Sequence, residues 1–464
     1  KKIRKTDWKI KNIPKDLLKR QVEITGPPVP KKMFISALNS GANCYMTDFE
    51  DSLTPTFDNL LQGQLNLKDA ISRKIDFIDQ KSGKEYKLNE KIAVLIVRPR
   101  GLHLDEKNIT IDNKRISGTF FDLGLSLFHN AKKLIENGSG PYFYLPKLEH
   151  YLECRLLNDI ISFCEKKLGL NLGTVKVTVL IETINAVFQM DEFLWELKDH
   201  IVGLNAGRWD YLFSYQKVYR NSQKVILPDR SKVNMFVPFM SNYNKLLVDT
   251  CHRRGAFGMG GMSAQVIAKA NPKEVNERAL AGVKKDKERE LNQGNDGAWV
   301  AHPSLVEPVK NIFEKNFNGP NQLNKFNNEK ISRRDLLDEP KIDNEITEQG
   351  LRENLNEGIE YMAFWKIGTG CCVVNYLMAD AATCEVSRAQ LWVWLKYKVK
   401  LNDGRMVDEK LIDELIKEEL QKINQKFKTW KERSGDKSLD NVSFEGAAKT
   451  FKDMITKKDF DDFL

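Results

Sequence analysis

The sequence KVTVLIETINAVF, residues 176–188, contains the pattern that decides the fold: a β-branched run that is uncharged after Lys176, then the carboxylate of Glu182, then an amphipathic segment. A second apolar run, residues 201–204, is followed in the same way by Asp210. Acidic residues just past buried parallel strands are typical of α/β barrels, which keep their chemistry at the carboxyl ends of the strands. Two such carboxylates, with little histidine or thiolate nearby, predict an oxygen-ligand site suited to Mg²⁺.

Short apolar runs recur from residue 44 onward, each leading into a polar, proline or glycine position and then a longer segment. Eight strands alternating with helices predict a TIM (β/α)₈ barrel, although an open doubly wound sheet has the same alternation. The polar strand ends would then meet on one face. The runs are Cys44–Met46, Ala93–Val97, Tyr142–Leu145, Val175–Ile181, Ile201–Leu204, Met235–Val237, Ala256–Met259 and Ala298–Val300.

The composition along the chain divides it into four parts. Residues 35–310 form the predicted barrel domain, and residues 1–34, short and proline-rich, form a predicted N-terminal clasp on it. Frequent Asn, Lys and Asp predict a surface connection over residues 311–345. Residues 346–464 predict a C-terminal helical domain, because one face of the 409–430 segment is apolar at helical spacing. That face carries Leu411, Leu415, Ile416, Leu420 and Ile423.

The overall composition narrows the class of protein. With 464 residues, 41% hydrophobic and 30% charged, the chain can bury a large core, and no apolar run approaches the roughly 18 to 20 residues of a membrane helix. Seven cysteines without C-x-x-C spacing predict reduced thiols, and the six histidines form no zinc motif. The net charge of +9 comes from lysines mixed with acidic residues, which favours an anionic small substrate over nucleic acid.

Six motifs occur in one order along the chain and identify a family. They are VEITGP (22–27), TDFEDS (47–52), RPRG (98–101), GRWD (207–210), DGAWVAHP (296–303) and MADAAT (378–383). Together they closely resemble malate synthases of the shorter, A-type branch, over nearly the whole chain. The resemblance implies condensation of acetyl-CoA with glyoxylate, hydrolysis of malyl-CoA to malate and CoA, and a Mg²⁺ cofactor. It also implies a TIM barrel with an N-terminal clasp and a C-terminal helical domain.

The resemblance also assigns the metal and glyoxylate sites. It makes Glu182 and Asp210 the metal ligands, which agrees with the oxygen donors that Mg²⁺ prefers. The backbone amides of Gly207, Arg208 and Trp209 would hold the carboxylate of glyoxylate. An alternative is that the two acids are structural ion-pair partners.

The resemblance implies a base and an electrophile for the acetyl group. Asp380 matches the residue that takes a proton from the acetyl methyl, and Arg98 matches the charge that stabilises the enolate oxygen. Asp380 also has the sequence context of a helix N-cap, and it can serve both purposes.

Further residues carried over from the family are less specific. Glu50 and Asp51 would orient metal-bound water and Arg98, unless they belong to a solvated loop. The acetyl-CoA contacts would involve Pro146, Lys147, Pro238, Pro303 and Cys371. The chain departs from the family pattern at Phe57, Leu102 and Ala379, none of which is a predicted ligand or base.

Two rival functions share parts of this pattern. One is a malyl-CoA or citryl-CoA lyase of the same barrel superfamily, which would lack the long C-terminal domain bearing Asp380. The other is a catalytically silent scaffold or binding protein. We expect a cytoplasmic enzyme that contacts neither nucleic acid nor membrane, or a peroxisomal or glyoxysomal one if a C-terminal targeting tail is missing from this chain. The sequence leaves open whether the enzyme is a monomer or a small homo-oligomer.

Overall fold

The computed structural model describes residues 2–337, 344–434 and 437–464, so part of the predicted 311–345 connection, residues 338–343, lies outside the described residues. The chain forms two compact units. The first contains residues 1–208 and 243–331, and the second contains residues 209–242 and 332–464. Among the described helices, none combines the length and the apolar character needed to span a membrane.

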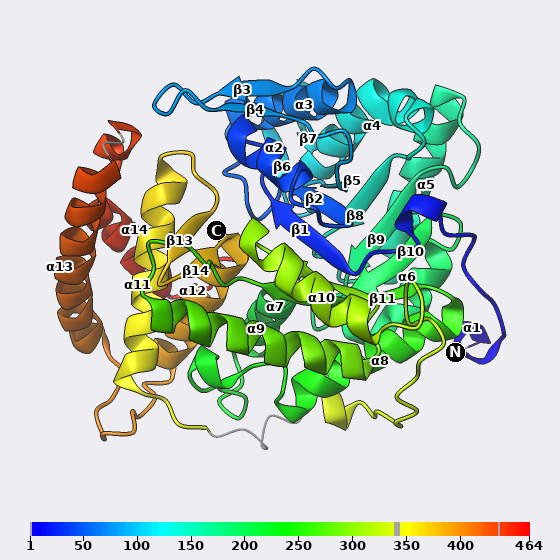
Figure 1. The fold of residues 1–464 in the computed structure, drawn as a ribbon. Helices are drawn as coiled ribbons and strands as arrows, with labels where there is room; N and C mark the ends of the chain where they lie inside the picture. The colour runs from blue at the N-terminus through cyan, green and yellow to red at the C-terminus, as the bar shows by residue number, and fades with distance from the viewer. Residues whose placement is uncertain (1, 338–343, 435–436) are drawn as a thin grey trace. The chain divides into compact units, whose positions relative to one another are not determined.

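The first unit is a closed barrel of parallel strands, which confirms the predicted fold (Figure 1). Around the barrel the order is β1-β12-β11-β10-β9-β8-β5-β2, so each strand lies beside its neighbours in the chain and the first strand closes onto the last. The strands are β1 (Val22–Gly26), β2 (Cys44–Asp48), β5 (Val94–Arg98), β8 (Tyr142–Leu145), β9 (Lys176–Leu180), β10 (Ile201–Asn205), β11 (Phe257–Ser263) and β12 (Gly297–Val300).

One predicted strand is wrong and another was overlooked. Residues 235–237 form a turn, because Pro238 cannot donate to a strand ladder and instead starts a helix. The eighth strand is β1, which the sequence pattern had placed in the N-terminal clasp. Its second residue, Glu23, is fully buried and is neutralised inside the barrel by Arg20, whose Nε donates to Glu23 Oε1 at 2.6 Å. Tyr144 and Trp299 also donate to this carboxylate.

Helices surround the barrel strands in the first unit (Figure 1). The predicted alternation of strand and helix therefore holds around most of the barrel. The helices are α1 (Lys2–Lys5), α2 (Lys31–Leu38), α3 (Phe57–Ile71), α4 (Gly118–Glu136), α5 (Tyr151–Leu168), α6 (Met190–Glu196), α8 (Pro238–Arg254), α9 (Lys273–Gln293) and α10 (Val306–Asn316). Two small antiparallel hairpins are added, β3 (Asp76–Ile78) with β4 (Glu85–Lys87) and β6 (Asp105–Ile111) with β7 (Lys114–Ser117).

The second unit is mainly helical. The predicted amphipathic segment lies in α13, where Leu415 and Ile423 are buried in a core shared with Ile359 of α11 and Trp394 of α12. The elements are α7 (Arg208–Tyr219), α11 (Glu348–Lys366), β13 (Cys372–Val374), β14 (Leu377–Ala379), α12 (Ala381–Lys396), α13 (Glu409–Ser434) and α14 (Phe444–Thr456).

The segment between α7 and α8 belongs to this helical unit although it lies between two barrel strands in the sequence. The carbonyl of Pro228 accepts a hydrogen bond from Gln390 Nε2 at 2.6 Å. The carbonyl of Leu227 accepts one from Trp394 Nε1 at 3.1 Å. Asp229 Oδ2 accepts one from the Thr347 hydroxyl, which caps α11, at 2.6 Å. The segment is therefore fixed to α11 and α12.

Candidate active site

Charged side chains gather at the carboxyl ends of four neighbouring barrel strands. Asp48 ends β2, Arg98 ends β5, Lys147 follows β8 and Glu182 follows β9. Parallel strands bring these ends to one edge of the barrel, which is where a TIM barrel carries its functional groups. All four residues lie in the first unit.

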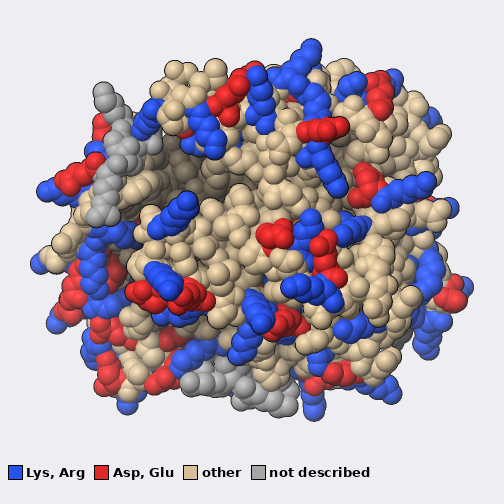
Figure 2. All heavy atoms as spheres, viewed as in Figure 1, with Lys and Arg blue, Asp and Glu red and all other residues tan. Residues whose placement is uncertain are grey.

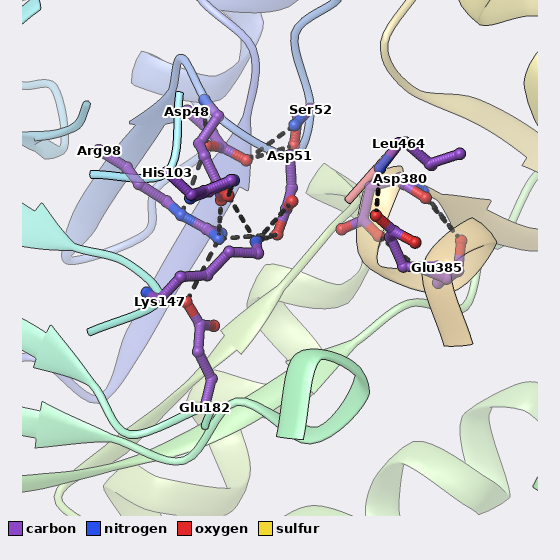
Figure 3. Close-up of polar contacts among 12 residues, drawn as sticks. Asp48, Asp51, Ser52, Arg98, His103, Lys147, Glu182, Asp380, Glu385 and Leu464 are labelled. Atoms are coloured by element: carbon purple, nitrogen blue, oxygen red, sulfur yellow. Dashed lines mark hydrogen bonds and ion pairs between the residues drawn. The ribbon is translucent and has the colours of Figure 1, made fainter. Parts of the chain in front are cut away.

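Arg98 is at the centre of this cluster (Figure 3). Its side chain is 4% exposed, and Nη2 donates to Glu50 Oε2 and, at 2.7 Å, to Asp51 Oδ2. Glu182 Oε1 lies 3.7 Å from the same nitrogen. Burial alone would lower the pKa of Arg98, but the surrounding carboxylates raise that pKa well above its usual value. The guanidinium is therefore a permanent positive charge.

Lys147 supplies the second positive charge of the cluster. Its Nζ donates to Glu50 Oε1 at 2.5 Å and to Asp51 Oδ1 at 2.8 Å. Its backbone, in the left-handed region with φ of 53°, donates its N–H to Glu182 Oε1 at 2.8 Å. Burial raises the pKa of Glu50 well above its usual range, although Arg98 and Lys147 oppose the shift. Carboxylates outnumber cations here, which favours binding of a further cation.

Asp48 organises the turn that presents the two predicted orienting acids. Its Oδ1 accepts the Glu50 N–H at 2.9 Å, and its Oδ2 accepts the Ser52 N–H at 3.0 Å and the Ser52 hydroxyl at 2.7 Å. Asp48 was not among the site residues predicted from the sequence. A signal was present, because an Asp in a turn commonly accepts the backbone N–H two residues on, as Asp48 does from Glu50.

Gly207 brings the end of β10 against Glu182. A Cβ on residue 207 would lie 2.8 Å from Glu182 Oε2 and 2.9 Å from Glu182 Cβ. The preceding strand pairs with β9, with Asn205 opposite Leu180. Only glycine therefore fits at residue 207 without displacing the predicted metal ligand.

The remainder of the GRWD motif begins helix α7. Arg208 is its first residue, and Asp210 lies buried in its first turn. Trp209 and Asp210 belong to the second unit, where the Arg230 guanidinium carbon lies 5.6 Å from the centre of the Trp209 ring. The N-terminus of an α-helix presents backbone N–H groups that bind anions.

Asp380 is the N-cap of α12, as its sequence context predicted. Its Oδ1 accepts the Thr383 N–H at 3.2 Å, and the Thr383 hydroxyl returns a bond to the Asp380 carbonyl at 2.8 Å. Further along the same helix, Glu385 accepts hydrogen bonds from Arg388 and from the backbone N–H of Leu464 (Figure 3). The start of α12 is thus locally well fixed.

The residues predicted to contact acetyl-CoA are dispersed over both units. Pro146 and Lys147 follow β8, and Pro303 opens the short 3₁₀ helix Pro303–Leu305 in the first unit. Pro238 opens α8, and Cys371 is half-buried just before β13 in the second unit. The Lys147 amine is already engaged by two carboxylates. The sequence analysis had not found that ion pair.

Comparisons with known proteins agree with the sequence motifs. A family model described as the malate synthase TIM barrel domain matches residues 94–339, and one described as the malate synthase C-terminal domain matches residues 345–464. The malate synthase of Myxococcus xanthus is 47% identical over 466 residues, which cover 99% of this chain and 85% of that protein. The glyoxysomal malate synthase of Brassica napus is 44% identical and covers 100% of this chain and 82% of that protein.

A solved structure has the same fold at low sequence identity. The Haloferax volcanii malate synthase in a magnesium/glyoxylate complex matches with a TM-score of 0.50 and 11% identity, over 93% of this chain and 97% of that chain. The family models cover both the barrel and the helical region, and the relatives match nearly the full length. The resemblance found in the sequence is confirmed, and the chain belongs to the malate synthase family.

Proposed function

We propose that this chain joins acetyl-CoA to glyoxylate and hydrolyses the resulting malyl-CoA, with Arg98 as the charged centre of the reaction. The activity is that of an acyltransferase of the glyoxylate cycle. The observation that supports the role of Arg98 is its fixed position: it is buried, permanently charged and held by Glu50 and Asp51 at the carboxyl end of the barrel. A preorganised positive charge of this kind stabilises an enolate oxygen more strongly than water does.

Asp380 is the proposed base. Its carboxylate takes a proton from the acetyl methyl group, and the electron pair of that C–H bond forms the enolate of the thioester. The enolate carbon then bonds to the aldehyde carbon of glyoxylate, the π electron pair of the carbonyl moves to its oxygen, and that oxygen takes a proton from water to give malyl-CoA. Water cleaves the thioester to malate and CoA. Asp380 lies at the N-terminus of α12, where its Oδ1 accepts the Thr383 N–H at 3.2 Å, so the carboxylate is held in one place.

Glu182 and Asp210 are the proposed ligands of Mg²⁺. Among the described residues no three His, Cys, Asp or Glu side chains form a metal-binding group. Two carboxylates still fit this ion, because Mg²⁺ commonly takes one or two carboxylates and completes its shell with water and substrate oxygens. The excess of carboxylates around Arg98 also favours a cation beside Glu182. When bound, Mg²⁺ would act as a Lewis acid on the glyoxylate carbonyl.

The backbone amides of Gly207, Arg208 and Trp209 are the proposed holders of the glyoxylate carboxylate. They lie at the start of α7, and the N–H groups and dipole at the N-terminus of a helix attract an anion. Glu50 and Asp51 act indirectly, by holding the Arg98 guanidinium in one orientation. Pro146, Lys147, Pro238, Pro303 and Cys371 remain proposed acetyl-CoA contacts.

The proposed partners are these two small substrates. Acidic and basic side chains are interspersed on the face drawn in Figure 2, a distribution typical of a solvated surface rather than a polyanion-binding stripe. For compartment we propose the cytoplasm, with a peroxisome or glyoxysome as the alternative.

The decisive test measures thiol release from acetyl-CoA with glyoxylate and Mg²⁺, on the wild-type protein and on Asp380→Asn. Asparagine keeps the N-cap but cannot act as a base, so the reaction should collapse while the fold remains. Asp408→Asn is the matched control, because Asp408 caps α13 through the Leu411 N–H at 2.8 Å without any proposed chemical role.

The outcomes separate the alternatives. Release that requires all three components, disappears in Asp380→Asn and persists in Asp408→Asn supports the base assignment. Release that survives in Asp380→Asn would move the base to another residue. No release from folded wild-type protein would refute the proposed activity.

A further inference from the structure

Arg230 connects two elements of the helical unit that carry separate parts of the proposed chemistry. It lies in the segment between α7 and α8, and its side chain is 12% exposed. On one side its guanidinium lies over the Trp209 ring at 5.6 Å, in the turn that begins α7. On the other side its Nη1 donates to Ser387 Oγ of α12 at 2.9 Å.

Ser387 transmits this contact to the start of α12. Its hydroxyl donates to the Thr383 carbonyl at 3.0 Å. Thr383 is the partner of Asp380 in the capping box, through the bonds between each backbone N–H and the other side chain. A continuous set of contacts therefore runs from the Trp209 ring through Arg230, Ser387 and Thr383 to Asp380.

Arg230 is itself held firmly. Its Nη2 donates to Glu357 Oε2 of α11 at 3.1 Å, and Glu357 is buried. The residues just before it, Leu227 to Asp229, are bonded to α11 and α12 through their carbonyls and the Asp229 carboxylate. Guanidinium is planar and offers several donors in a fixed fork, so it holds two partners in one geometry, whereas the donors of an ammonium group can rotate.

We propose that Arg230 is a positioning residue that holds Asp380 and the turn at Trp209 in fixed positions relative to one another. This inference rests on the proposed function, in which Asp380 is the base and the turn at Trp209 holds glyoxylate. Arg230 touches neither substrate; it acts through Ser387 and through the Trp209 ring. Small displacements of a catalytic base from its productive position lower the reaction rate by up to about 100-fold. The positioning of Asp380 by Arg230 would therefore be significant for catalysis.

The experiment compares Arg230→Gln and Ser387→Ala with a matched control, Arg352→Gln. Arg352 lies on α11 in the same unit and is 17% exposed, and among the described residues its ion pairs are with Glu348, Glu418 and Glu419, none of which is on α12. It therefore reports the general cost of losing a partly buried arginine. For Arg230→Gln we expect kcat to fall about 10- to 100-fold and the KM for glyoxylate to rise.

A readout specific to positioning is the isotope effect with acetyl-CoA deuterated in its acetyl methyl group. Misplacing the base slows proton abstraction selectively, so the deuterium effect on kcat should increase in Arg230→Gln and, to a smaller extent, in Ser387→Ala. It should stay at the wild-type value in Arg352→Gln. The double variant Arg230→Gln/Ser387→Ala should be no slower than Arg230→Gln alone, because both changes break the same connection.

Three results decide the matter. If Arg230→Gln and Arg352→Gln lose activity equally, with wild-type isotope effects, Arg230 is only structural and the inference is overturned. If Ser387→Ala and Arg230→Gln slow the reaction additively, the proposed connection is wrong. If Asp380→Asn keeps full activity, the base assignment fails first, and this outcome is distinct from the other two.

Discussion

Gly207→Ala perturbs the predicted metal site by a single methyl group while keeping the backbone N–H. The added Cβ would stand 2.8 Å from Glu182 Oε2 and 2.9 Å from Glu182 Cβ, whereas ordinary van der Waals contact begins near 3.4 Å. The two segments must therefore separate by roughly 0.5 Å. Lys147 holds the Glu182 carboxylate through a 2.8 Å hydrogen bond, so relief either stretches that bond or strains the backbone. Overpacking of this kind costs about 1–3 kcal/mol.

Displacement of Glu182 should weaken Mg²⁺ binding. If that strain is relieved at the ligand, 1–3 kcal/mol corresponds to about 5- to 150-fold in an equilibrium constant. We expect the Mg²⁺ concentration for half-maximal CoA release to rise within that range, and calorimetric titration with Mg²⁺ to show the same loss. The matched control is Gly26→Ala at the end of β1, where a Cβ would meet nothing within 4 Å. An unchanged Mg²⁺ dependence in Gly207→Ala, or an equal change in Gly26→Ala, would refute this reasoning.

Three further predictions follow from the same geometry. Arg98→Lys should lower kcat about 100- to 1000-fold in the CoA-release assay, because an ammonium group cannot keep the fork geometry of guanidinium. A decrease in kcat of less than about tenfold would contradict the proposed role of Arg98. Chelation of divalent cations should stop the wild-type reaction, and added Mg²⁺ should restore it. The Glu182→Gln variant should need a far higher Mg²⁺ concentration for the same recovery. If wild type and variant recover at the same Mg²⁺ concentration, Glu182 is excluded as a ligand. Burial would lower the pKa of His252, but Asp296 and the Lys325 carbonyl, each within 2.9 Å, raise it above its usual value. The stabilisation is therefore complete below about pH 6.5 and is lost as pH rises through the folded-state pKa. Denaturant unfolding of wild type and His252→Gln should show a difference in unfolding free energy that shrinks above about pH 6.5; a constant difference would disprove it.

Most of the barrel could be predicted because its strands have a local signature. The segments at 176–180 and 201–205 are mostly apolar and are buried, so their local sequence is sufficient to predict that they are strands. The first strand contains a buried charge, Glu23, and it can enter the barrel only because Arg20 neutralises that charge. The misassigned run at 235–237 is short, and Phe236 is 46% exposed. The short length of this run and the neighbouring Pro238 predict its structure better than its apolar content does.

The candidate site was predictable in part because the family resemblance assigns roles to individual residues of this chain. Glu182 is where the pattern put it, at the end of a buried strand, and Arg98 is paired with Glu50 and Asp51. The ion pairs of Lys147 were not foreseen, since nothing in Pro146-Lys147 indicates that the amine turns toward carboxylates presented by a different strand. The chemical roles of Glu182, Arg98, Asp210 and Asp380 remain predictions.

The segment around Arg230 shows where prediction from local sequence patterns fails. Residues 220–234 are mostly polar apart from the short apolar run 225–227, and they lack periodicity, so the local sequence is typical of a surface loop with scattered basic residues. Their fixed position depends on partners 167 residues away for Leu227, 162 for Pro228 and 118 for Asp229. No short stretch of sequence contains both members of such a pair. The entropic cost of closing the loop between them increases only slowly with loop length. The chain can therefore secure a loop to distant helices at modest cost, and Arg230 then acts on two elements that the sequence presents as unrelated.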